Sequence, residues 1–256
     1  MIKKILKALG LHVYAKFIRE KYFPAKSQQN EKNIITERVS FYRQFLNVGD
    51  LCFDIGANIG NRTRVFLQLG AKVVAIEPQS ECVKMLKLRF GKKISIVPKA
   101  LGKEEKDGVI YIGESSAISS LSTEWIETVS KVRFKGKQWN KQETVAITTL
   151  DKLIERYGVP QFCKIDVEGY EEEVLNGLSK KIPYLSLEYA LPEKKTGIVN
   201  CLTILSKIGE FQCNYTIGEK MKLELPTWVG PDELVSRLNA IPSPNPYGDI
   251  YIHFRN

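Results

Sequence analysis

The sequence predicts an α/β protein with a doubly wound, mostly parallel sheet and a helical extension at its N-terminus. From residue 47 onward, short apolar stretches alternate with amphipathic ones, which is typical of strands and covering helices joined by right-handed crossovers. The chain has 256 residues, enough for one sizeable domain of this kind but cramped for two. A glycine-rich turn at residues 54–60 follows the first apolar stretch, where such sheets bind ligands.

The first 46 residues are expected to form the helical extension. Apolar residues recur at helical spacing over residues 1–23, and the lysines there lie mostly on the other face. We expect this basic amphipathic helix to dock on the domain, and peripheral contact with a membrane surface is the alternative. Residues 25–32 are polar and predict a linker, followed by a second helix at residues 34–46.

Residues 47–256 are expected to form the α/β domain. The expected strands are 51–54, 72–76, 94–97, 109–112, 144–148, 162–166, 184–188, 211–216 and 249–254. The expected helices are 61–69, 80–90, 150–157, 171–178 and 200–208. Residues 113–142 are too long and polar for a simple connection, so they predict a lid or insertion.

Composition restricts the classes of partner. No apolar run reaches the roughly 18 residues that a membrane-spanning helix needs. Five scattered cysteines without a C-x-x-C pair favour free thiols in a reducing cytoplasm. The formal charge of +9 suits anionic partners, but the sequence has no aromatic stacking platform or nucleic-acid module signature. Nucleic acid is therefore not an expected partner.

The turn Asp54-Ile-Gly-Ala-Asn-Ile-Gly60 departs from both common phosphate-binding patterns. No Lys-Ser/Thr pair follows Gly60, as a P-loop requires, and Asn58 stands at the middle glycine position of a pyrophosphate loop. Asp54 places a carboxylate at the mouth of the turn, and this charge disfavours a diphosphate and favours a cation such as an ammonium group. Gly56 and Gly60 let a ligand approach the backbone.

A second acid ends the next apolar stretch. Glu77 follows Asp54 at close to the 20-residue offset of acids that bind ribose hydroxyls, and Pro78 stiffens the turn after it. One acid facing a ribose and another facing an amino group outline S-adenosylmethionine. The sulfonium cation of that molecule also suits an acidic cleft.

Several short motifs occur in order along the chain. They are Asp54-Ile-Gly-Ala-Asn-Ile-Gly60, Ile76-Glu-Pro78, Lys99-Ala-Leu-Gly102, Ser119-Ser-Leu121, Thr149-Leu-Asp151 and Lys164-Ile-Asp-Val-Glu-Gly-Tyr-Glu171. Over roughly residues 47–254 the sequence thereby resembles the FkbM family of S-adenosylmethionine-dependent methyltransferases. The resemblance implies a Rossmann-like class I fold, with a seven-stranded sheet whose last strand is antiparallel. It also implies O-methylation of a hydroxyl group on a sugar, glycan or related metabolite.

The resemblance assigns further candidate residues for the cofactor and the acceptor. In such folds the turn after the third strand lies against the adenine, which here places Ala100 and Leu101 beside it. The motif containing Ser119 and Ser120 is expected at the cofactor or the substrate.

The acids after the strand at residues 162–166 are the candidate catalytic residues. Alternation along that strand predicts that Asp166 and Glu168 point to one side, toward the ligand crevice. Methyl transfer to a hydroxyl is helped by removing its proton, and both histidines, His12 and His253, are remote from the crevice along the chain. Asp166 is therefore the expected base, close to the cofactor, and Glu168 is expected to position the substrate or the S-adenosylmethionine amine.

A metal-assisted version of the site is a weaker alternative. Glu188 ends the next expected strand, so Asp166, Glu168 and Glu188 would gather carboxylate ligands that suit Mg²⁺. Carboxylates on neighbouring strand ends are also common without a metal. The expected site therefore holds none, and Glu188 is expected to contact the substrate.

Residues 113–142 carry basic residues interspersed with aromatic ones. These residues are Lys131, Arg133, Lys135, Lys137 and Lys141, with Trp125, Phe134 and Trp139. A basic rim with aromatics would hold an anionic sugar, and a mobile solvated loop is the alternative.

Two other activities stay open on the same fold class. A nicotinamide-dependent oxidoreductase is disfavoured by Asp54 and Asn58. An N- or C-methyltransferase is a closer rival, but the Asn/Asp-Pro-Pro-Tyr block that many N-methylating enzymes carry after the fourth strand is missing.

Overall fold

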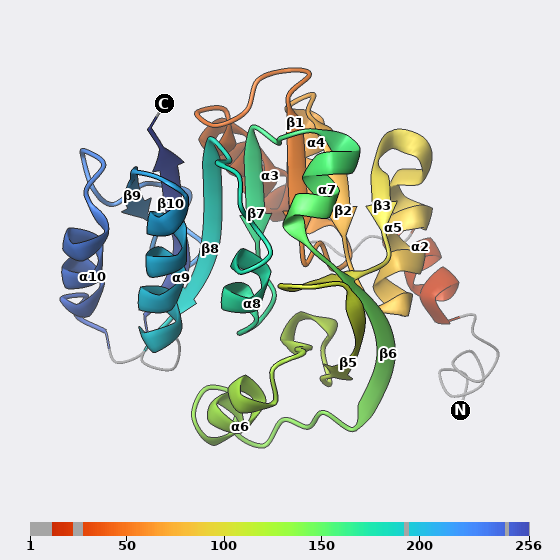
Figure 1. The fold of residues 1–256 in the computed structure, drawn as a ribbon. Coiled ribbons are helices and arrows are strands. Elements are labelled where there is room, and N and C mark those ends of the chain that lie inside the picture. The colour runs from red at the N-terminus through yellow and green to blue at the C-terminus, as the bar shows by residue number, and fades with distance from the viewer. Residues whose placement is uncertain (1–11, 23–27, 192–194, 244–245, 256) are drawn as a thin grey trace.

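The structure is a computed structural model that describes residues 12–22, 28–191, 195–243 and 246–255. Its centre is a seven-stranded sheet (Figure 1). Across the sheet the strands are β3 (Ser95–Val97), β2 (Lys72–Ile76), β1 (Leu51–Ile55), β7 (Phe162–Ile165), β8 (Tyr184–Ala190), β10 (Tyr247–Phe254) and β9 (Phe211–Tyr215). All neighbours are parallel except that β10 runs antiparallel to β8 and β9. The predicted mostly parallel sheet with an antiparallel last strand is confirmed.

Helices cover both faces of this sheet, because alternate strand residues are apolar on opposite sides. Phe53 and Ile55 belong to a core shared with α7 (Leu150–Tyr157), α8 (Glu171–Leu175), α9 (Lys195–Ile208) and α10 (Pro231–Asn239). Cys52, the residue before Phe53, faces the other side of the sheet and packs in a core shared with α3 (Gln28–Tyr42), α4 (Asn61–Gln68) and α5 (Ser80–Phe90). The order in which the strands are added to the sheet reverses between β1 and β7. The carboxyl ends of these two strands therefore border the expected ligand crevice.

A second, three-stranded sheet lies below the strand ends of the first in the view of Figure 1. It contains β4 (Ala100–Leu101), β6 (Lys141–Thr148) and β5 (Lys106–Ile112), and α6 (Thr123–Lys131) lies in the connection between β5 and β6. Two short 3-10 turns, at Gly91–Lys93 and Ser116–Ile118, complete the elements. The sequence predicted strands within β5 and β6, but it missed β4, α6 and α10.

The N-terminal segment packs on the domain in its described part. Helix α2 (His12–Tyr22) lies against α5, and Val13 is buried there. Helix α3 begins at Gln28, so the predicted linker is wrong for residues 28–32. Residues 1–11 and 23, on which the membrane-contact alternative also depends, lie outside the described residues. In the part of the chain that the structure describes, no helix combines the length and the apolar character needed to cross a bilayer.

The predicted boundary at residue 46 stays a prediction. Side chains on both sides of it share one core, because Phe45 stacks on Phe162 and on Tyr251, with ring centroids 5.4 and 5.2 Å apart. Tyr42 also packs edge-on against Phe66 and Phe162. The extension therefore contributes aromatic rings to the core that supports β1 and β7.

Candidate active site

A cleft of about 460 Å³ opens beyond the carboxyl ends of β1, β2 and β7. Most of the residues predicted from the sequence line it: Asp54, Gly56, Asn58, Glu77, Pro78, Ala100, Leu101, Ser119, Asp166, Glu168 and Glu188. Gly60 and Ser120 do not line it. Ala100 and Leu101, together with Ile110 and Leu121, supply apolar surface at the side formed by the small sheet.

The turn after β1 passes very close to the end of β7. Gly56 has a φ of +75°, and a Cβ atom built on it would lie 1.8 Å from the carbonyl oxygen of Asp166. The amides of Gly56 and Ala57 both donate to the carbonyl of Ile76, and the amide of Asp166 donates to Ile55. Only glycine fits this approach, which holds the three strand ends together around the cleft.

Asp54 lies at the base of this turn. Its side chain is buried, and its Oδ2 accepts a hydrogen bond of 2.5 Å from the hydroxyl of Thr63. Burial raises the pKa of the Asp54 carboxyl, and the Thr63 hydrogen bond and the charge of Lys164 oppose that rise. A cation bound beside Asp54 would favour its ionised form.

Glu77 is held by the backbone around it. Its two carboxylate oxygens accept the amides of Asn58 and Gln79, each at 2.8 Å. Burial nevertheless raises the pKa of Glu77 to about 7, and the two amide hydrogen bonds limit the rise. Each carboxylate oxygen can accept more than one hydrogen bond. The two oxygens of Glu77 can therefore also accept hydrogen bonds from two hydroxyl groups.

Gly60 and Ser120 support the residues of the site without lining the cleft. Gly60 has a φ of +87°, and a Cβ atom there would lie 2.3 Å from the ring of Phe90, so it serves the packing of α4 on α5. Ser120 is fully buried, and its hydroxyl donates to the carbonyl of Glu168 at 2.6 Å. Their predicted contacts with cofactor and substrate would require a different arrangement from the one observed.

A polar network joins the small sheet to the turn after β1. The hydroxyl of Ser116 donates to the side-chain carbonyl of Asn58 at 3.0 Å, and the hydroxyl of Ser119 donates to that of Gln79 at 3.0 Å. Asn58 itself has a φ of +51°. The sequence analysis did not single out Ser116 or Gln79, although Gln79 follows Pro78 and Ser116 lies three residues before Ser119.

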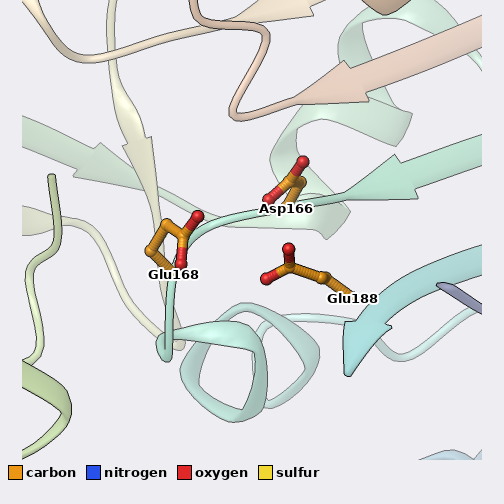
Figure 2. A group of neighbouring side chains, drawn as sticks. All are labelled: Asp166, Glu168 and Glu188. Atoms are coloured by element: carbon orange, nitrogen blue, oxygen red, sulfur yellow. The ribbon is translucent and has the colours of Figure 1, made fainter. Parts of the chain in front are cut away.

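Three carboxylates that line the cleft point toward one another (Figure 2). Asp166, Glu168 and Glu188 each offer an oxygen, and these oxygens all lie within 4.8 Å of one another. Such a group is geometrically able to share a cation or to surround one hydroxyl group. Strand ends β7 and β8 are neighbours in the sheet, which explains the approach of Glu188 to the other two.

The route by which Glu168 reaches the cluster differs from the prediction. Strand β7 ends at Ile165, so simple alternation does not set the direction of Asp166 and Glu168. Glu168 instead adopts a φ of +50°, an uncommon conformation for a residue with a side chain. The hydrogen bond from Ser120 holds its carbonyl, and Trp125 packs over the adjacent Gly169, where a Cβ atom would lie 2.3 Å from the indole.

Lys164 is a site residue that the sequence analysis missed. Its side chain is 3% exposed, and its Nζ lies 2.8 Å from Oδ2 of Asp166 and 3.8 Å from Oδ1 of Asp249. Burial by itself lowers the pKa of Lys164, but the two carboxylates outweigh it and the net shift is upward. A lysine inside the otherwise apolar stretch Phe162-Cys-Lys-Ile165 was the available signal, because a buried charge needs a partner.

The aromatic residues of segment 113–142 do not line the cleft. Trp125, Phe134 and Trp139 pack on one another, with ring centroids 6.0 and 6.4 Å from that of Trp125, in a small core with Ile118 and Val129. The segment is thus folded around α6, and a basic rim interleaved with exposed aromatics is not what the structure contains. Lys137 pairs with Glu114 at 3.0 Å, and neither residue lines the cleft.

Comparison with known proteins gives a consistent picture. Residues 54–208 match the family model described as the methyltransferase FkbM domain. The hexuronic acid methyltransferase AglP of Haloferax volcanii is 26% identical over 152 residues, which are 58% of this chain and 57% of AglP. The chain thus matches little more than half of that relative's length.

Solved structures of methyltransferases also align with the chain. The precorrin-6y C5,15-methyltransferase of Geobacter metallireducens GS-15 has a TM-score of 0.43 and 11% identity, covering 87% of this chain and 88% of that one. Pyrococcus horikoshii TYW2 in complex with MeSAdo has a TM-score of 0.42 and 11% identity, covering 85% of this chain and 62% of that one.

Proposed function

The chain belongs to the FkbM family of methyltransferases, whose cofactor is S-adenosyl-L-methionine, and we propose that it methylates a hydroxyl group of a sugar, a glycan precursor or a related metabolite. The observation that carries the proposal is the convergence of Asp166, Glu168 and Glu188 in the same cleft as Asp54 and Glu77. Membership of a methyltransferase family leaves no reason to retain the oxidoreductase alternative.

The cleft has the chemistry to hold the cofactor in one orientation. Glu77 would accept the ribose hydroxyls, because its carboxylate is fixed by two amides and keeps acceptor capacity. Ala100 and Leu101 offer the adenine an apolar surface. Asp54 would attract the ammonium group of the methionine portion. Gly56 lets the turn that carries these groups approach the end of β7, because it has no side chain.

The acidic cluster would remove the proton from the acceptor. When bound, the cofactor supplies an electrophilic methyl group for an in-line displacement. Asp166 is the proposed base: as the acceptor oxygen forms its bond to the methyl carbon, the hydroxyl proton passes to the Asp166 carboxylate. Lys164 beside Asp166 favours the charged, proton-accepting form. Glu168 and Glu188 would hold the hydroxyl in line, and we propose that the reaction proceeds without a metal.

The relative AglP supports a carbohydrate acceptor, since its name describes a methyltransferase of hexuronic acid. Among the side chains that the structure describes, His253 does not line the cleft and so offers no competing base. The described residues do bring carboxylates to the cleft, which supports a carboxylate as the proton acceptor.

Methyl transfer is tested by incubating the protein with methyl-labelled S-adenosyl-L-methionine and fractionated glycans and lipid-linked precursors, and locating the label by mass. We expect a labelled carbohydrate whose methyl group survives mild base, because an ether resists hydrolysis and a methyl ester does not. Label on nitrogen or carbon would replace the proposed O-methylation by the rival activity. A base-labile label would move the acceptor atom from a hydroxyl to a carboxylate.

A further inference from the structure

Two arginines from distant parts of the chain meet at one edge of the cleft. Arg38 of α3 and Arg62 of α4 both line it, and their side chains are 18% and 14% exposed. Their Nη2 atoms donate to the same oxygen, Oε2 of Glu219, at 2.7 and 3.0 Å. One carboxylate thus bridges two guanidinium groups.

The bridge leaves the arginines only partly satisfied. Arg38 Nε and Arg62 Nη1 are buried, and neither has a hydrogen-bond partner among the residues that the structure describes. A buried donor without a partner is costly, and two guanidinium groups present more donors than one oxygen can accept. The geometry therefore suits an anion with several oxygen atoms better than it suits Glu219 alone.

The position of Glu219 would allow its side chain to move away from the two arginines. Its side chain is 63% exposed, and it follows Gly218, which has a φ of +62°, in the turn after β9. Burial raises the pKa of Glu219, but Arg62 and Arg38 outweigh it and the net shift is downward. Glu219 is therefore an anion at neutral pH, held by partly solvated ion pairs that contribute little net stability.

We propose that Arg38 and Arg62 form a carboxylate-binding subsite for the acceptor, which Glu219 occupies until the acceptor displaces it. This inference rests on the proposed function, because the subsite shares the cleft with the acidic cluster. The acceptor would then carry both a carboxylate, bound by the arginines, and the hydroxyl that Asp166 deprotonates. A uronic acid is the simplest carbohydrate with both groups.

A carboxylate could also come from the methionine portion of the cofactor, since the charge of Arg62 acts on Asp54. The positions of Arg38 and Glu219 in the sequence favour the acceptor as the source of the carboxylate. Arg38 and Glu219 both lie outside residues 54–208, the span that matches the family model. Residues that select an acceptor are expected to differ from those that bind the common cofactor.

The test is isothermal titration of glucuronate into the protein saturated with S-adenosylhomocysteine. Glu219→Ala should bind glucuronate about fivefold more tightly than the wild type, because a competing ion pair is gone. Adding Arg38→Gln to that variant should weaken binding by at least about tenfold, and Arg38→Lys should lie between, because lysine keeps the charge but not the planar fork. Glu233→Ala, which removes an exposed partner of Arg237 outside the cleft, is the matched control and should match the wild type.

Three results would overturn the proposal. One is the failure of glucuronate to bind Glu219→Ala, and another is equal binding after Arg38→Gln is added. The third is a tenfold weaker affinity of Arg38→Gln for S-adenosylhomocysteine alone, which would assign the arginines to the methionine carboxylate. Failure of the proposed function is a separate result: glucuronate would bind as expected, but no fraction would become labelled.

Discussion

Lys164 and Asp166 form an ion pair of 2.8 Å at the end of β7, and the lysine is almost completely buried while the aspartate faces the cleft. The pair joins the core of the protein to its reactive surface. Since Lys164 also lies 3.8 Å from Asp249 on the antiparallel strand β10, its charge is shared between a residue of the site and a residue of the scaffold.

Replacing Lys164 by methionine should destabilise the protein by about 3 kcal/mol, because two carboxylates then lose their common cation. Chemical unfolding measures this change. Lys152→Met is the control, since it removes an exposed pair with Glu155 and should cost less than about 1 kcal/mol. Adding Asp249→Asn to Lys164→Met should recover part of the loss. Equal stability of the two lysine variants would contradict a shared buried charge.

Replacing Asp166 by asparagine should abolish methyl transfer and keep the affinity for S-adenosyl-L-methionine within about tenfold, because the amide cannot accept the acceptor's proton. Single-turnover assays and titration calorimetry measure the two quantities. Asp107→Asn, on the exposed side of β5, should leave both unchanged. A turnover rate for Asp166→Asn that equals the wild type would remove Asp166 from the role of base.

Gly56→Ala should cost far more stability and cofactor affinity than a glycine substitution elsewhere with the same backbone strain. Its new Cβ would lie 1.8 Å from the Asp166 carbonyl, so the turn after β1 must move away from β7. Gly49→Ala is matched to it, because Gly49 has a φ of +90° and nothing within 4 Å of a Cβ atom. That control should lose only about 1–2 kcal/mol of unfolding free energy. Similar losses in both variants would mean that strain, and not the close approach, explains Gly56.

The affinity for S-adenosyl-L-methionine should increase as the pH rises through about 7. Glu77 has a pKa of about 7 in the folded protein, against an ordinary value of 4.5, and its ionised form is the better acceptor for ribose hydroxyls. Titration calorimetry at pH 6, 7 and 8 measures the trend, which should be much weaker in Glu77→Gln. An identical pH profile for that variant would place the ribose elsewhere.

The same residue should make the cofactor-free protein less stable as the pH rises. A raised pKa means that the folded state binds the proton more tightly than the unfolded state. Its contribution is therefore complete below pH 4.5 and is lost as the pH passes about 7, on the order of 3 kcal/mol. The slope between pH 5 and 8 should flatten in Glu77→Gln.

Methyl transfer should persist after exhaustive treatment with EDTA, because the proposed reaction uses the acidic cluster as base and hydrogen-bond acceptor. Activity that disappears with EDTA and returns with Mg²⁺ would show instead that Asp166, Glu168 and Glu188 hold a cation, as their spacing allows. Glu188→Gln separates the cases further. If the reaction depends on a metal, this variant should have a lower affinity for Mg²⁺. If the reaction resists EDTA, any change in the rate of the variant should be independent of Mg²⁺.

The sequence was sufficient to predict the α/β class and the positions of most strands, because apolar periodicity and turn residues act over short distances. It also placed Asp54, Glu77 and Asp166 at one edge of the sheet, since the carboxyl ends of parallel strands meet there. The two helices that it missed are short, at nine residues each, although each buries an i, i+4 pair: Trp125 and Val129 in α6, and Leu234 and Leu238 in α10.

What the tertiary structure alone decided is how the charges are paired. Lys164 of β7 meets Asp249 of β10 across β8, and Glu219 meets Arg38 from 181 residues away. Glu168 reaches the acidic cluster through a backbone conformation that Ser120 supports. Each of these contacts joins segments that are far apart in the chain. Short-range patterns do not report them, because burial and charge compensation depend on where the completed fold places each side chain.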